Sequence, residues 1–139
     1  MERAIRWLRI SYWTGAIADA LAFLEMLFPG ALQAALGQSG PDITMEFRLA
    51  QAFGAPLMIG WTVLLLWANR KPMERRAVLA ITICPVLVGL LIRGVLGATT
   101  GVFVGSTAVT AIVVPIVMMT LLGYSLLLAT RAVQTTESR

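Results

Sequence analysis

The chain has 139 residues, of which 58% are hydrophobic and only 13% are charged, against about 25% charged in an ordinary soluble domain. It carries 11 basic and 7 acidic residues, no histidine and one cysteine. These counts exclude an internal disulfide, a haem or zinc site built on histidine, and catalysis by a histidine base. We therefore expect an all-α integral membrane protein that carries no cofactor and no metal.

Four apolar segments are each long enough for a helix that crosses a bilayer, which takes about 20 residues. The second of them has no charged residue, and the third is free of charge until Arg93. The Gly-rich stretch 97–106 is predicted as loop, with an extension of the third helix left open. The pattern predicts a single membrane domain, residues 1–139, folded as an antiparallel four-helix bundle. Its helices cover residues 10–28, 49–69, 77–96 and 107–130, with a short outer helix at 31–37.

The basic residues are strongly biased toward one side of this bundle. Nine of the 11 lie in the N-terminal flank, the loop 69–76 and the tail, and only Arg48 and Arg93 lie on the other side. The positive-inside rule then predicts that both termini and this loop are cytoplasmic. Short loops and an Arg- and Ala-rich composition favour a multi-pass protein of a bacterial inner membrane. Four side chains are expected to contact anionic headgroups rather than nucleic acid: Arg70, Lys71, Arg75 and Arg76.

Helix 10–28 carries two carboxylates, Asp19 and Glu25, beside a stripe of small residues. The opposite face is large and apolar, with Trp13, Ile17 and Leu24, so we expect this face to meet lipid and both acids to point inward. A charge at the bilayer centre costs roughly 3 kcal/mol, which favours pairing. Glu25 and Arg93 lie at similar distances from the outer ends of their helices. We expect them to form a pair whose role is mainly structural.

Asp19 lies about 9 Å deeper than Glu25, at 1.5 Å per helical residue, and no basic residue of another span matches that depth. Burial without a cation favours the protonated acid. One hypothesis is a proton- or cation-responsive site at Asp19. The alternatives are a neutral Asp19 that hydrogen-bonds across helices, or one satisfied by Arg93. The expected neighbours are weak donors and hydroxyls: Trp61, Thr62, Thr82 and Thr120.

The sequence favours an accessory or interaction subunit without catalytic turnover, in contact with a membrane protein partner or a second copy. The alternative is a small proton-coupled transporter or channel subunit that uses Asp19. The segment GAIAD, residues 15–19, resembles the first helix of small multidrug resistance transporters, which also have four helices. Here Asp stands for the usual Glu and the loop charge is asymmetric, so membership is not inferred. A lipid-modifying enzyme ranks last, because no nucleophile, metal cluster or phosphate-binding motif accompanies the acids.

Overall fold

The computed structural model describes residues 1–30 and 44–137. Every element within these ranges is helical, which confirms the predicted all-α class. The short helix predicted at 31–37 lies outside the described residues. The elements, in chain order, are α1 Glu2–Leu27, α3 Met45–Asn69, α4 Ala77–Ile81, the π-helical turn η1 Thr82–Leu87, α5 Val88–Thr99 and α6 Ser106–Glu137.

Three stretches of helix within the described residues are long and apolar enough to cross a membrane: Met45–Asn69, Ala77–Thr99 and Ser106–Thr135. They correspond to the second, third and fourth predicted spans. Helix α1 is not among them, because two carboxylates and several polar side chains lower the hydropathy of its apolar part. The number of spans and the side on which the termini lie stay predictions.

Several helix boundaries differ from the predicted ones. Helix α3 begins at Met45 rather than at residue 49, and α6 continues to Glu137 rather than ending at residue 130. Helix α1 begins at Glu2 rather than at residue 10, because a helix does not need to end where the bilayer ends. The third helix continues to Thr99, so the first part of 97–106 extends a helix and residues 100–105 connect it to α6. Gly101 and Gly105 in this connection have positive φ, at 74° and 58°. Such backbone geometry suits glycine and ends the helix there.

The third predicted helix contains a π-helical turn at Pro85. Proline has no amide hydrogen, and its ring clashes with the carbonyl of the residue four positions earlier in an α-helix. A wider turn moves this carbonyl away from the ring, and α4, η1 and α5 follow one another without a break. The proline therefore widens the helix locally and does not divide it.

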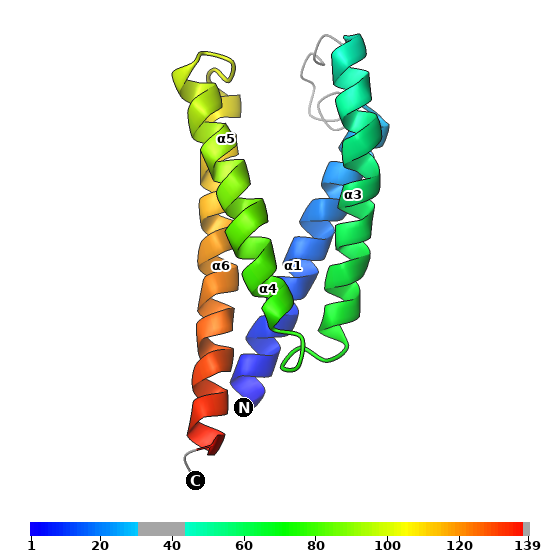
Figure 1. Cartoon of the computed structure of the whole chain (residues 1–139). Coiled ribbons are helices and arrows are strands. Elements are labelled where there is room, and N and C mark those ends of the chain that lie inside the picture. The colour runs from blue at the N-terminus through cyan, green and yellow to red at the C-terminus, as the bar shows by residue number, and fades with distance from the viewer. Residues whose placement is uncertain (31–43, 138–139) are drawn as a thin grey trace. The chain divides into compact units, whose positions relative to one another are not determined.

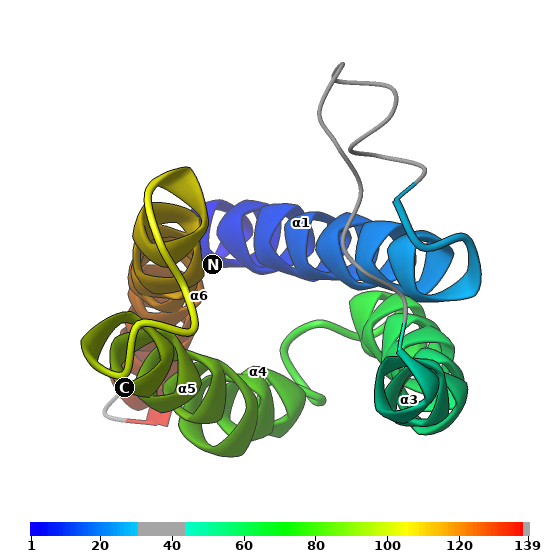
Figure 2. The ribbon, with the colours of Figure 1, turned by 90° about the horizontal axis from the view of Figure 1, so that it is seen from above.

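The chain forms two compact units. Unit 1 comprises Met1–Tyr12 and Ala68–Arg139, and unit 2 comprises Trp13–Trp67, so α1 contributes to both. In unit 1, α5 and α6 lie side by side, as both views show (Figures 1 and 2). They approach so closely that a Cβ atom on Gly94 would overlap the backbone of Ala111. Small residues permit such contacts between membrane helices.

Unit 2 contains the second half of α1 and most of α3. Two glycines mark where these helices meet: a Cβ built on Gly15 would lie 3.0 Å from Cδ1 of Leu65, and one on Gly54 would lie 3.0 Å from Sδ of Met26. In both places the glycine of one helix faces a long, flexible side chain of the other. At these two positions, the backbone of one helix therefore contacts the terminal side-chain atoms of the other helix.

Candidate functional site

Asp19 lies on the part of α1 that belongs to unit 2, and its side chain is partly buried. Within the described residues it makes no hydrogen bond and no ion pair. The side of this helix that was predicted to meet lipid is exposed, because Trp13, Ile17 and Leu24 are each about half exposed. The acid thus lies away from the most exposed apolar side chains, and its functional role stays a prediction.

Glu25 and Arg93 each have a contact within their own unit. An Oε1 oxygen of Glu25 accepts a hydrogen bond from the backbone N–H of Gly30 at 3.0 Å, which stabilises the turn that follows α1. The guanidinium carbon of Arg93 lies 5.9 Å from the ring centroid of Phe103, a distance that allows a cation–π interaction. Glu25 belongs to unit 2 and Arg93 to unit 1, and the pairing between them stays a prediction.

The three threonines expected near Asp19 use their hydroxyl hydrogens within their own helices. Thr62 donates to the carbonyl of Met58 at 2.9 Å and Thr82 to that of Val78 at 2.8 Å. Thr120 donates in the same way to Ile116. Their hydroxyl oxygens can still accept a hydrogen bond. Thr62 belongs to unit 2, as Asp19 does, whereas Thr82 and Thr120 belong to unit 1, and a contact of these threonines with Asp19 stays a prediction. The indole of Trp61, half-buried on α3, completes the predicted set.

The basic segment 69–76 is a series of turns between α3 and α4. Lys71 forms an ion pair with Glu74 at 3.0 Å, with both side chains largely exposed. The guanidinium of Arg76 donates to the carbonyl of Met73 at 3.5 Å, and Arg70 is exposed. The carbonyl of Arg75 accepts a hydrogen bond from the hydroxyl of Tyr12 at 3.0 Å. The loop is therefore hydrogen-bonded to α1, and two of its cations, Arg70 and Lys71, are exposed.

Unit 1 contains a buried polar contact that was not predicted from the sequence. Ser11 on α1 donates to Ser125 on α6 at 2.8 Å, and both side chains are 0% exposed. Ser125 in turn donates to the carbonyl of Leu122 at 2.9 Å. One turn away on α1, Trp7 packs edge-on against Tyr124 with ring centroids 5.2 Å apart. The only sequence signal was Ser11 itself, which lies in the small-residue stripe; nothing indicated that Ser125 is its partner.

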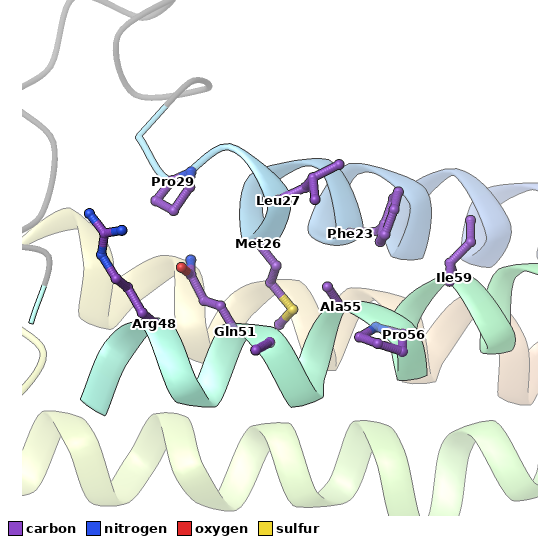
Figure 3. Close-up of a pocket in the computed structure, with 10 residues that line it drawn as sticks. Phe23, Met26, Leu27, Pro29, Arg48, Gln51, Ala55, Pro56 and Ile59 are labelled. Atoms are coloured by element: carbon purple, nitrogen blue, oxygen red, sulfur yellow. The ribbon is translucent and has the colours of Figure 1, made fainter. Parts of the chain in front are cut away.

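A groove of about 600 Å³ lies between α1 and α3 in unit 2. Arg48 and Gln51 lie at one end together with Pro29, and Phe23 and Ile59 lie at the other (Figure 3). The remaining lining is apolar or small. The groove is thus polar at the end of the helix pair and apolar toward its middle. No pattern in the sequence indicated this groove, because its lining comes from two segments, 23–29 and 48–59, that are separated by 18 residues.

Comparisons with protein families, with curated proteins and with solved structures give no match to this chain. Within the described residues, no three His, Cys, Asp or Glu side chains are grouped so that they could hold a metal ion.

Proposed function

We propose that this protein resides in a membrane and acts there through contacts with other membrane components, as an accessory or interaction subunit without turnover. One observation carries the proposal. Three helices have the length and hydropathy of membrane spans, yet only 17–22% of their most apolar windows are buried within the chain. Apolar surface of that extent is not stable in water and needs lipid or a partner to cover it.

Membrane residence is tested by washing membranes that contain the full chain with alkaline carbonate, which strips peripheral proteins. We expect the protein to stay in the pellet and to require detergent for release. Release by carbonate alone would contradict the proposal.

The proposed topology has four spans, with α1 as the first, and places both termini and the loop 69–76 in the cytoplasm of a bacterial inner membrane. The basic loop then contacts anionic headgroups. The test replaces the exposed Cys84 by serine and introduces one cysteine, Lys71→Cys or Val102→Cys. An impermeable thiol reagent added to intact spheroplasts should label the second variant and spare the first. The reverse labelling contradicts the topology.

The interaction role is tested by the mass of the particle in native lipid discs made without prior detergent. A single copy weighs 15.0 kDa, and we expect a discrete larger assembly, either with a second copy or with one partner at fixed stoichiometry. Discs that hold one copy alone in every preparation would contradict an interaction subunit.

A second candidate function is proton-coupled transport that depends on Asp19. It is supported by the position of this partly buried acid, which makes no hydrogen bond or ion pair to the part of the chain that is described. Intramembrane acids are often functional. In vesicles with the purified chain, an imposed pH gradient should decay faster than in empty vesicles, and Asp19→Asn should abolish the difference. Unchanged proton flux in Asp19→Asn removes this candidate.

A further inference from the structure

We propose that the groove between α1 and α3 binds one anionic phospholipid, with its phosphate near Arg48 and one acyl chain along the apolar part. This inference rests on the proposed membrane residence. It concerns a site within unit 2, separate from Asp19 and from the basic loop 69–76. Three features of the groove carry it: its unpaired cation, the order of polar and apolar lining along its length, and its volume.

Arg48 supplies the charge. Its side chain is exposed on the first turn of α3, and no residue of the described chain engages its guanidinium in an ion pair or hydrogen bond. Of the four acids on α1 and α3, two lie near the helix ends that carry the polar part of the groove. Glu25 already accepts the N–H of Gly30, and Glu46 lies two residues before Arg48, so the two side chains point to nearly opposite sides of the helix. The fork of a guanidinium matches the oxygens of a phosphate.

The order of the lining residues matches the orientation of a lipid in a bilayer. Arg48 and Gln51 lie at the helix ends, where headgroups are, and the side-chain amide of Gln51 is a further donor. From Arg48 to Ile59 the helix rises about 16 Å at 1.5 Å per residue. Along this length the groove is lined by Phe23, Met26 and other apolar or small residues (Figure 3). A headgroup at one end therefore leaves an acyl chain alongside the apolar lining.

Pro56 adds a polar feature to the groove. Because proline has no amide hydrogen, the carbonyl of Ala52 lacks the usual helical donor four residues later. Ala52 also lines the groove. The groove volume of about 600 Å³ lies within the range of about 300–1,000 Å³ of sites that bind small molecules.

The test is native mass spectrometry of the full chain equilibrated in detergent with equal amounts of phosphatidylglycerol and phosphatidylcholine. We expect one retained lipid, predominantly phosphatidylglycerol. Arg48→Gln should reduce the preference for the anionic lipid about fivefold, the effect of one cation near a headgroup. Arg131→Gln is the matched control, because it removes the same charge from an exposed position on α6, outside both the groove lining and the loop 69–76, and it should leave the preference unchanged. If both variants reduce the preference for phosphatidylglycerol equally, the proposed site is contradicted and the preference comes from non-specific electrostatic attraction.

A second variant tests the apolar part of the groove. Ala52→Phe places a ring in the groove from an exposed position, and it should reduce retention of both lipids while the ratio between them stays the same. Unchanged retention overturns the proposal. If the unsubstituted chain is a dimer and Ala52→Phe is a monomer, the groove binds a second copy of the chain, and this result would also overturn the proposal. Carbonate extraction of each variant distinguishes the two proposals. If the chain stays in the membrane but shows no lipid preference, only the lipid site is contradicted. If carbonate releases the chain, the proposed function is contradicted.

Discussion

Unit 1 and unit 2 both bring helices together at glycines, but the atoms opposite those glycines differ. In unit 1, Gly94 faces the backbone of Ala111, and a buried hydroxyl pair links α1 to α6. In unit 2, Gly54 faces the end of the Met26 side chain. Backbone cannot move without displacing a whole helix, whereas a methionine has several rotamers. We expect unit 1 to tolerate substitution poorly and unit 2 to adapt, which suits a groove that accommodates a flexible lipid.

The largest effect is expected for Gly94→Ala. Its new methyl group would overlap the carbonyl of Ala111, so α5 and α6 must separate, at a cost of about 2–3 kcal/mol in the free energy of unfolding. Gly89→Ala on the same helix is the control, because nothing lies within 4 Å of its Cβ position. Thermal unfolding in detergent should show a lower Tm for the first variant and an equal or higher one for the second. Equal Tm values would contradict the close approach of the two helices.

A smaller effect is expected for the buried serine pair. Ser11→Ala and Ser125→Ala should each destabilise unit 1, with a coupling of about 1 kcal/mol between them, since hydrogen bonds between membrane helices contribute about 0.6–1.7 kcal/mol. A double-mutant cycle on the free energy of unfolding in mixed micelles measures this coupling. Thr110→Ala, which removes an exposed hydroxyl that bonds only to its own helix, serves as the control. If the changes in unfolding free energy of the two single variants simply add in the double variant, the hydrogen bond between the serines does not contribute to stability.

The smallest effect is expected for Gly54→Ala. Met26 must shift its terminal atoms, but alanine favours the helix over glycine by about 1 kcal/mol, so the two effects nearly cancel. We expect the unfolding free energy to change by less than about 0.5 kcal/mol. Measured beside Gly94→Ala, this variant gives the sharpest contrast between the units. A loss as large as that of Gly94→Ala would show that unit 2 is packed as rigidly as unit 1.

Much of the fold could be predicted from local sequence. Apolar runs located the three span-like helices, and the exposed face of α1 followed from the positions of Trp13 and Ile17. The extent of α1 was underestimated, because hydropathy reports the bilayer and not hydrogen bonding along the backbone. The third helix was also predicted too short. Gly97 was assigned to the loop, although it lies in α5, where the ring of Phe103 occupies the space that a Cβ would need.

The candidate site was less accessible to sequence reasoning. Asp19, Glu25 and Arg93 stood out as charges within apolar segments, and their residue types alone drew attention to them. The pairing of Ser11 with Ser125 and the lining of the groove left no comparable signal. Helix α6 is apolar on every side, so periodicity does not reveal which face packs against a neighbour.

The sequence by itself determined the helical class and the three span-like segments, because the transfer of apolar residues from water to lipid is summed over each segment and depends little on its neighbours. Only the tertiary structure decided which hydroxyls meet, which glycine faces backbone and where Arg48 lies above an apolar groove. Those features depend on the rotation of each helix about its own axis. In helices that are apolar all round, that rotation is set by packing between side chains and not by the contrast between polar and apolar faces.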